Sequence, residues 1–591
     1  MAGLRSIRRV AGVIWLIPVF LMCLGAQSDA PAQTFKGPQL GVASRFGQSW
    51  QPEILAAARL LPALNFRDEI YWRRIEYLDG QFAFTQNMTT YPDRLLAHGA
   101  TLSLIIAGTH PDYDNGQTPH TPGAVAAFAR MASRLAVHFP TVRSLEIGNE
   151  FNSQDFVSGP VQDADIAARA GFFNALLKEV YTRAKAENPE IRIIGGAALG
   201  IPAGFLTHVF EAGGANYMDA LALHPNTTHS EQLVRQIDVV RRINGAATIP
   251  IEITEFGDPD PLAAAARLLK GHCQLALSGV SRIVWYPLSD RGDGMTPLLG
   301  DDHTLTPVGQ AYRFIQHQLV GEDVQNASAD PFTYGCFYGP DKLVLWGETR
   351  NIKVSDGVAV FTAEGRKLPA NLAQLSMRQP LVFLSQQPIV WGRDVVLSEQ
   401  PILADSYHQF AYPRDDQRYS NADGFTRFAR RQNRDVPLVT HPGQTGPGTM
   451  WTPSLADPGD GFVRLTAQSL RPAGSESAPV EVVHLYRSEI NQTVDVSALF
   501  APRSSSEDGV KLTVWVNGEI VETRIIKAAY RFVRMGHRMK AGDRIEFSIG
   551  PNGTANGDVT DYRITILNST TRQEIDAPFP DLILSRNADG T

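Results

Sequence analysis

The sequence predicts an α/β protein: a (β/α)8 TIM barrel followed by a small β-domain and a C-terminal β-sandwich of jelly-roll type. Three observations support this prediction. Short apolar runs alternate with helical patterns over residues 38–318. With a further strand near Phe66, these runs make eight strands in about 280 residues, which is the count and size of a TIM barrel. Beyond residue 320 the hydrophobic period falls to two, as in half-buried strands.

The expected barrel strands are short runs rich in Ile, Val, Leu or Ala, as strands covered on both faces require. Seven runs lie at residues 40–43, 102–107, 142–147, 191–194, 218–223, 249–253 and 283–285, and an eighth strand is expected near Phe66. The clearest helix covers residues 165–187, where apolar side chains recur every three or four positions until Asn188-Pro189 ends it. The barrel is therefore expected over residues 31–318.

Residues 319–392 are expected to form the small β-domain packed on the barrel, and residues 393–591 the C-terminal β-sandwich. The clearest strands are residues 342–346, 358–361 and 381–384 in the first, and 511–516, 543–549 and 562–567 in the second. Residues 413–453 are polar, rich in arginine and weak in pattern, so we expect long loops there.

The N-terminus has the pattern of an export signal. Arg5, Arg8 and Arg9 precede an apolar run over residues 10–26. This arrangement predicts a secretory signal peptide over residues 1–30 and a periplasmic or secreted protein. The alternative is an uncleaved inner-membrane anchor, for which the run is slightly short. Contact with a membrane is expected only in that case.

Composition narrows the classes of partner and cofactor. The net charge is -7, which gives no reason to expect nucleic acid as a partner. No phosphate loop, dinucleotide fingerprint or Gly-x-Ser-x-Gly elbow occurs in the sequence, and no cofactor is predicted. The chain has 3 cysteines, and Cys273 and Cys336 remain once Cys23 is removed with the signal peptide. Export permits a disulfide between them, but two independent buried thiols are the preferred interpretation.

Two carboxylates stand where chemistry occurs in a TIM barrel, at the ends of strands. Glu150 follows Asn149 at the end of the fourth strand, and Glu255 ends the seventh. These strands lie across the barrel mouth from each other. Glycoside hydrolysis needs such a pair, with one carboxyl group protonated and one ionised. Glu146 and Glu252 lie earlier in the same strands, and we expect Glu146 to pair with a buried arginine.

Two motifs carry a resemblance to a known family. Residues 145–152, Leu-Glu-Ile-Gly-Asn-Glu-Phe-Asn, resemble the acid/base motif of clan A glycoside hydrolases, above all the family 39 form Phe-Glu-Ile-Trp-Asn-Glu-Pro-Asn. Residues 253–257, Ile-Thr-Glu-Phe-Gly, are similar to the nucleophile motif of that clan. The likeness covers roughly residues 38–392 and extends to exported glycosidases of bacterial exopolysaccharide systems. Gly148 and Phe151 depart from the motif, where Trp and Pro are usual.

The resemblance implies a retaining glycosidase that acts on a polysaccharide, with a β-linkage expected, and that needs no cofactor and no metal. Glu255 is then the nucleophile and Glu150 the general acid/base, while Asn149 binds the sugar 2-hydroxyl. Trp285 ends the eighth strand, where the clan places an aromatic sugar platform; an ordinary buried Trp is the alternative. The C-terminal module resembles the jelly-roll modules of carbohydrate-active enzymes and either binds glycan or acts as a spacer.

Two rival functions use the same scaffold. One is a transglycosylase that passes the same intermediate to a sugar acceptor. The other is a non-catalytic polysaccharide-binding or assembly protein on a degenerate barrel, which the survival of both Glu150 and Glu255 opposes.

Four further residues are candidates for the site. Arg67 either keeps Glu255 ionised or pairs with the neighbouring residues Asp68 or Glu69. His224, at the end of the sixth strand, orients a catalytic carboxylate, binds substrate, or is a core histidine satisfied by the backbone. His110 and Tyr113 follow the third strand and could contact sugar. A metal interpretation of His110 with nearby Asp and His residues is weak, because no helical His-x-x-x-His spacing occurs.

Overall fold

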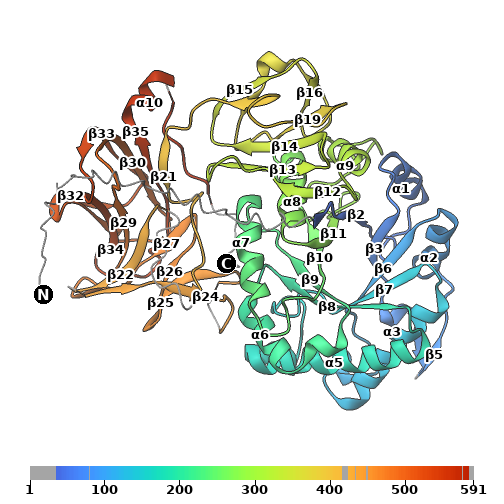
Figure 1. Ribbon diagram of the computed structural model, residues 1–591. Helices are drawn as coiled ribbons and strands as arrows, with labels where there is room; N and C mark the ends of the chain where they lie inside the picture. Colours follow the sequence, from blue (N-terminus) through green and yellow to red (C-terminus); the bar gives the residue numbers. More distant parts are fainter. Residues whose placement is uncertain are drawn as a thin grey trace, which may run out of the picture.

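A computed structural model describes residues 35–78, 80–414, 424–432, 434–446, 450–575 and 577–584 (Figure 1). The expected signal peptide over residues 1–30 lies outside these ranges. Within them, none of the helices combines the length and the apolar character needed to cross a membrane.

The N-terminal half is a closed barrel of eight parallel strands, which confirms the predicted fold class. Its strands are β2 (Gln39–Ala43), β3 (Asn65–Glu69), β6 (Thr101–Ile106), β7 (Val142–Ile147), β8 (Arg192–Leu199), β9 (Ala220–His224), β10 (Ile251–Phe256) and β11 (Val280–Trp285). β11 returns to β2, with Trp285 opposite Val42, and this pairing closes the barrel.

Helices surround the barrel in alternation with its strands (Figure 1). They are α1 (Pro52–Ala57), α2 (Asn87–Ala97), α3 (Pro122–His138), α5 (Ile166–Glu187), α6 (Ala203–Glu211), α7 (Ser230–Arg241), α8 (Ala264–Leu277) and α9 (Pro307–Gln318), with the short α4 (Pro160–Asp163) in the loop before α5. α5 begins where the Asp165 carboxylate accepts the Ala168 N–H and ends before Asn188-Pro189, as expected.

The small β-domain takes one strand, β1, from the residues before the barrel and its other strands from the residues after it. Its main sheet has the order β1 (Phe35–Lys36), β12 (Asp323–Asn326), β13 (Thr333–Tyr338), β14 (Lys342–Gly347), β19 (Leu381–Ser385), β16 (Val358–Phe361) and β17 (Lys367–Leu368). A second sheet joins β18 (Gln374–Leu375), β15 (Arg350–Val354) and β20 (Val395–Leu397). Since β20 pairs with β15, the strands of this domain extend past residue 392.

A disulfide joins the barrel to the small β-domain. Cys273 on α8 is bonded to Cys336 on β13, with their Cα atoms 5.8 Å apart. The expectation of two independent thiols is therefore wrong. The two positions are 63 residues apart in sequence, and only the packing of α8 against β13 brings them together.

The C-terminal domain is a sandwich of two antiparallel sheets. One has the order β24 (Val439–His441), β25 (Ser454–Asp457), β26 (Asp460–Leu465), β27 (Ser469–Arg471), β35 (Thr560–Asn568), β30 (Gln492–Pro502) and β33 (Tyr530–Met539), with β21 (Ile402–Asp405) also on β35. The other has the order β23 (Arg434–Pro437), β22 (Thr426–Arg431), β29 (Ala478–Arg487), β34 (Arg544–Pro551), β31 (Val510–Val516) and β32 (Glu519–Ile526), with β28 (Ala473–Ser475) on β29. Helix α10 (Ser569–Ile575) follows β35.

Residues 413–453 contain strands β22, β23 and β24, so the expectation that long loops fill this stretch is wrong. The polar composition that suggested loops has a structural explanation. Arg427 on β22 is buried, and its guanidinium lies over the Phe410 ring at 5.0 Å. Arg430 likewise lies over Phe428 and Trp515. Aromatic faces thus accommodate the buried Arg427 and the partly exposed Arg430.

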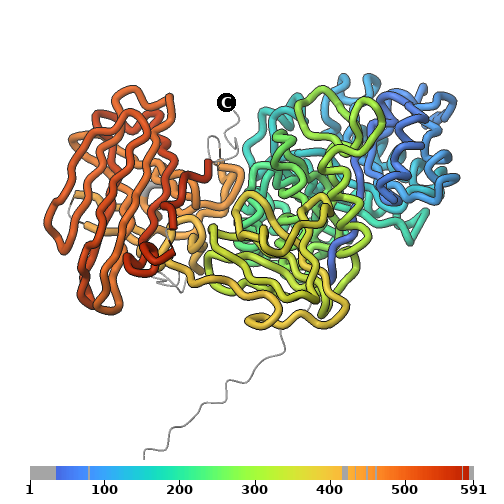
Figure 2. The backbone as a smooth tube through the Cα atoms, turned by 90° about the horizontal axis from the view of Figure 1, so that it is seen from above, coloured from blue at the N-terminus to red at the C-terminus, as the bar shows by residue number. Residues whose placement is uncertain are grey.

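The three domains meet around Glu231 on α7, which is buried. Its carboxylate accepts hydrogen bonds from Lys270 on α8 at 2.7 Å, Trp346 on β14 at 2.9 Å and the Tyr407 hydroxyl of the sandwich at 3.0 Å. Burial opposes the charge, but the charges of Lys270 and His229 together with the hydrogen bonds outweigh it, and the pKa of Glu231 lies well below its usual value. Figure 2 shows the sandwich beside the barrel, with the small β-domain between them on one side.

Candidate active site

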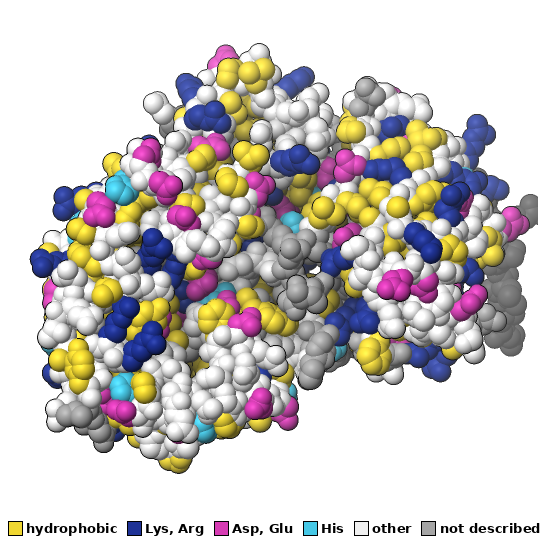
Figure 3. Space-filling view, turned by 180° about the vertical axis from the view of Figure 1, so that it is seen from behind, with side chains coloured by type: hydrophobic (Ala, Val, Ile, Leu, Met, Phe, Trp, Pro, Cys, Tyr) yellow, Lys and Arg dark blue, Asp and Glu magenta, His cyan; other side chains and the backbone are white. Residues whose placement is uncertain are grey.

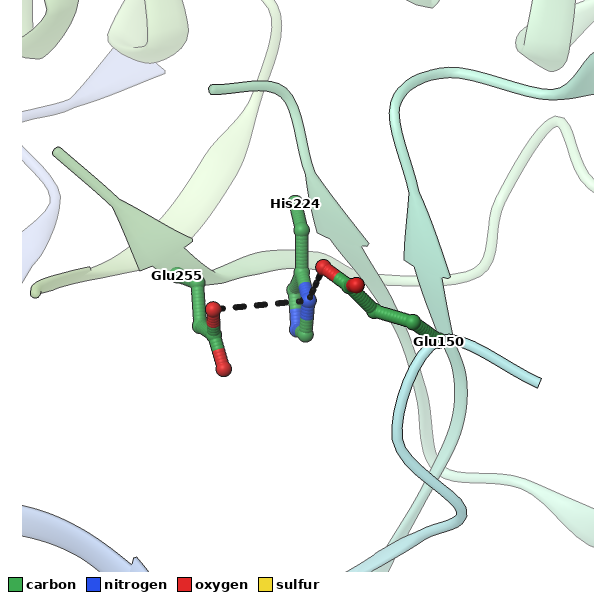
Figure 4. Close-up of side chains that lie close together, drawn as sticks. All are labelled: Glu150, His224 and Glu255. Carbon is green, nitrogen blue, oxygen red and sulfur yellow. Dashed lines mark hydrogen bonds and ion pairs between the residues drawn. The ribbon is translucent and has the colours of Figure 1, made fainter. Parts of the chain in front are cut away.

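Three side chains from three strand ends converge at the barrel mouth. Glu150 follows β7, His224 ends β9 and Glu255 lies near the end of β10. A carboxylate oxygen of each Glu and a ring nitrogen of His224 all lie within 4.8 Å of one another. Figure 4 shows the two carboxylates on either side of the imidazole. The structure therefore brings together the two carboxylates that the sequence singled out.

Arg67 on β3 binds Glu255 through its guanidinium. Its Nη1 donates to Glu255 Oε1 at 2.6 Å, while Nε and Nη2 donate to both oxygens of Glu146 at 2.9 and 2.8 Å. Nη2 also donates to Asn149 Oδ1 at 3.2 Å. Burial opposes the guanidinium charge, but Glu146 and Glu255 raise the pKa of Arg67 above its usual value. A permanent cation thus faces Glu255 and stabilises its negative charge.

The alternative partner for Arg67, Asp68, has a different role. Its carboxylate accepts the Ser44 hydroxyl at 2.5 Å and the Phe46 N–H at 2.7 Å. Glu146 pairs with a buried arginine as expected, and the arginine is Arg67.

His224 connects Glu150 to the same network. It is 0% exposed. Its Nδ1 lies 3.0 Å from Glu150 Oε1, and its Nε2 lies 3.0 Å from the Thr254 hydroxyl, which donates to Glu146. Since the hydroxyl donates its proton to Glu146, Nε2–H must be the donor to Thr254. His224 is therefore buried between the Glu150 carboxylate and the Thr254 hydroxyl.

The charge state of His224 follows from its surroundings. Burial lowers the pKa of the imidazole, but the charge of Glu255 and the hydrogen bonds to Glu146 and Glu150 raise it to about 9. At neutral pH the ring is then an imidazolium, and Nδ1–H donates to Glu150.

The backbone around Glu150 has an uncommon conformation. Glu150 has φ +45° and Gly148 has φ +76°. The Glu150 N–H donates to the Ala197 carbonyl on β8 at 2.7 Å. A Cβ on Gly148 would meet the rings of Phe151 and Phe173 at 3.4 and 3.6 Å. The two departures from the family motif, Gly148 and Phe151, are therefore linked, because the Phe151 ring fills the space beside the glycine.

Three expected substrate contacts have protein partners in the structure. Trp285 is 0% exposed, and its indole N–H donates to the Thr296 carbonyl, so the expected sugar platform is wrong for this residue. His110 is buried, with Nε2 3.0 Å from the Glu76 carbonyl. Tyr113 is half-buried, stacks on Trp72 and donates its hydroxyl to the Glu76 carboxylate. His110 and Tyr113 thus stabilise the loops around Trp72.

Sequence reasoning missed Tyr286, which follows Trp285. It is half-buried, the Arg291 guanidinium lies 5.0 Å from its ring, and its hydroxyl donates to Asp293. Burial raises its pKa, and the hydrogen bond to Asp293 and the charge of nearby Glu255 raise it further. The signal was the adjacent aromatic pair at the end of a strand, where successive side chains point to opposite faces.

Sequence reasoning also missed Glu69, the last residue of β3. It has the same strand parity as Arg67, so both side chains point into the barrel, with Glu69 nearer the mouth. Burial and the charge of Asp68 raise its pKa to about 7. The parity of β3 alone could have identified it.

The fold has known counterparts, although no family model and no curated protein matches the sequence. A family 39 glycoside hydrolase from the gut symbiont Bacteroides cellulosilyticus WH2 is similar, with a TM-score of 0.50 and 17% identity, over 59% of this chain and 81% of that one. A family 39 β-xylosidase from Caulobacter crescentus matches with a TM-score of 0.43 and 16% identity, over 60% of this chain and 98% of that one. The likeness to the first of these structures shows the fold: the chain has the barrel architecture found in family 39 glycoside hydrolases.

Proposed function

We propose that the protein is an exported retaining glycoside hydrolase that cleaves a β-linked polysaccharide or exopolysaccharide by double displacement. One observation carries the proposal: carboxylate oxygens of Glu150 and Glu255 lie within 4.8 Å of each other at the barrel mouth. Retaining enzymes hold their carboxyl groups about 5 to 5.5 Å apart, whereas inverting enzymes need about 6.5 Å or more to admit a water.

The different partners of the two carboxylates suit them to different roles. Arg67 holds Glu255 by Oε1, so Oε2 is the oxygen that attacks the anomeric carbon. The C–O bond to the leaving group breaks as the bond to Glu255 forms, and Glu150 gives its proton to the departing oxygen. Asn149 is held through Oδ1 by Arg67, which leaves its amide N–H groups for the sugar 2-hydroxyl.

The second step reverses these proton transfers. Glu150 is now a carboxylate, and His224 Nδ1–H donates to it. Glu150 removes a proton from a water as that water attacks the anomeric carbon, and the bond to Glu255 breaks. Export rests on the N-terminal pattern of residues 1–30.

The test is to trap the intermediate. The protein is incubated with 2,4-dinitrophenyl 2-deoxy-2-fluoro-β-glycosides of xylose, glucose and galactose, whose fluorine slows release more than formation of the adduct. Intact mass and peptide mapping should place one fluoroglycosyl group on Glu255. An adduct on Glu150 would reverse the roles. If proton NMR shows that hydrolysis of a β-linked polysaccharide first releases a product of inverted anomeric configuration, the mechanism is a single displacement and the double displacement is refuted. If β-linked polysaccharides are neither cleaved nor transferred to an added sugar acceptor, the proposal fails.

A further inference from the structure

A loop of the C-terminal sandwich contacts the barrel beside the candidate acid/base. The loop follows β24 and comprises residues 442–446 and 450–452 among those described. The Gly204 N–H, at the start of α6, donates to the Gly443 carbonyl at 3.0 Å. A Cβ on Gly204 would lie 2.1 Å from that oxygen. The two domains therefore meet backbone to backbone here, which requires glycine on the barrel side.

Gln444 of this loop is buried against the barrel. It is 4% exposed, and its backbone has φ +42°, an uncommon value for a residue with a side chain. Its N–H donates to the Met450 carbonyl at 2.5 Å. Its side-chain amide bonds Asn152 in both directions: Oε1 accepts from Asn152 Nδ2 at 2.8 Å, and Nε2 donates to the Asn152 carbonyl at 2.7 Å.

Asn152 connects this contact to Glu150. Its side chain is 1% exposed and binds the Leu199 backbone in both directions, accepting from N at 2.9 Å and donating to O at 3.1 Å. Ser153 N–H donates to the Glu150 carbonyl at 2.7 Å, and Glu150 N–H donates to Ala197 at the same end of β8. The loop carrying Glu150 is thus held by the end of β8, by the sandwich, and by Arg169 on α5, whose Nη1 also donates to the Asn152 carbonyl at 3.0 Å.

The conformation of Glu150 gives this contact a consequence. A non-glycine residue at φ +45° is in a sparsely populated region and persists only where its surroundings fix it. Two of the hydrogen bonds that hold this loop join Asn152 to Gln444, one donated by each residue. The Glu150 carboxyl must remain within hydrogen-bonding reach of the leaving oxygen to act as an acid.

We propose that Gln444 is a positioning residue for Glu150, so that the sandwich completes the active site of the barrel. This inference rests on the acid/base role proposed for Glu150. The two domains also meet away from Asn152. Arg242 on α7 donates to the Tyr412 and Pro413 carbonyls of the sandwich at 2.8 and 3.2 Å.

The test uses the full chain with Gln444→Met, which keeps the side-chain volume and removes both hydrogen bonds to Asn152. Arg242→Ala is the control, since it removes hydrogen bonds between the same two domains elsewhere. Each variant is assayed on phenyl and 2,4-dinitrophenyl β-glycosides of the sugar that the wild-type protein accepts. A phenol is a poor leaving group that needs the acid, and dinitrophenol needs little protonation.

We expect Gln444→Met to lower kcat/KM on the phenyl glycoside by about tenfold, because small displacements of a catalytic group are costly, and on the dinitrophenyl glycoside by less than about twofold. Arg242→Ala should leave kcat/KM unchanged on both substrates. Equal losses on both substrates, or no loss on either, would overturn the proposal.

A second measurement does not depend on activity. Hydrogen–deuterium exchange should become faster in Gln444→Met in the peptide covering residues 148–154, which contains the Glu150 and Ser153 amides, and remain unchanged in residues 251–257. Unchanged exchange in both peptides would show that Gln444 does not hold the loop, whether or not the protein is a glycosidase. Faster exchange in a protein without glycosidase activity would refute the function proposed for Glu150 and leave the contact intact.

Discussion

His224 Nδ1 lies 3.0 Å from Glu150 Oε1, inside a network that also contains Glu146 and Glu255. The imidazole is therefore surrounded by three carboxyl groups, with Arg67 as the other buried cation of the network. This arrangement makes a neutral histidine unfavourable and ties the charge of the ring to the stability of the barrel.

The first prediction concerns stability against pH. The folded pKa of His224 is about 9, above the unfolded value of 6.5. Its contribution to the free energy of unfolding is therefore fully present below pH 6.5 and is lost as pH rises through 9. The shift is worth about 3 kcal/mol. Urea unfolding of the barrel at pH 6, 7.5 and 9 should show this decline, and His224→Gln should flatten it.

His272 supplies the control for that experiment. It is buried on α8, and burial lowers its pKa to about 4. Its folded pKa lies below the unfolded value, so His272 lowers the free energy of unfolding only at pH below about 6.5, where the unfolded chain binds a proton that the folded protein does not. His272→Gln should leave the slope between pH 6.5 and 9 unchanged. An equally steep slope in His224→Gln would contradict the charge assigned to His224.

The second prediction separates the roles of the two carboxylates. Glu255→Gln removes the nucleophile, so activity should fall by about four orders of magnitude or more on every substrate. In Glu150→Ala the first step should survive with a dinitrophenyl glycoside, and the intermediate should accumulate because its hydrolysis lacks a base. Added azide needs no base and should restore turnover, with a β-glycosyl azide as product. Azide rescue in the Glu255 variant alone would reverse the assignment.

The third prediction concerns the three-way contact of Arg67. A lysine is a point charge without the planar fork that reaches Glu146, Glu255 and Asn149 together. Arg67→Lys should lower kcat by about 100-fold and destabilise the barrel by about 3 kcal/mol, because Glu146 loses its paired hydrogen bonds inside the barrel. Arg192→Lys is the matched control, since it makes the same change at a partly exposed arginine that binds another carboxylate, Glu252. Wild-type activity in Arg67→Lys would show that charge alone suffices.

The fourth prediction concerns the disulfide. Cys273 and Cys336 are 63 residues apart, and closing a loop of that length stabilises a protein by about 2 to 4 kcal/mol. The double variant Cys273→Ser, Cys336→Ser should lose that amount in denaturant unfolding without a change in kcat, because neither sulfur lies in the active site. A lower kcat with unchanged stability would instead connect α8 to catalysis.

The sequence by itself determined the barrel and its two carboxylates. Seven apolar runs are visible because parallel strands buried on both faces need continuous apolar residues, and an eighth strand was expected near Phe66. Glu150 and Glu255 could be found because chemistry in this fold is confined to strand ends. Even the pairing of Glu146 with a buried arginine could be expected, since a deep inward carboxylate needs a cation.

The tertiary structure alone decided the remaining features. Trp285 was indistinguishable in sequence from an exposed platform, and its burial depends on Phe256 and on the segment that carries Thr296. The bond between Cys273 and Cys336 and the contact of Gln444 with Asn152, 292 positions apart, leave no local pattern. Hydrophobic periodicity reports only which face of an element is buried, whereas these features depend on which distant element covers that face.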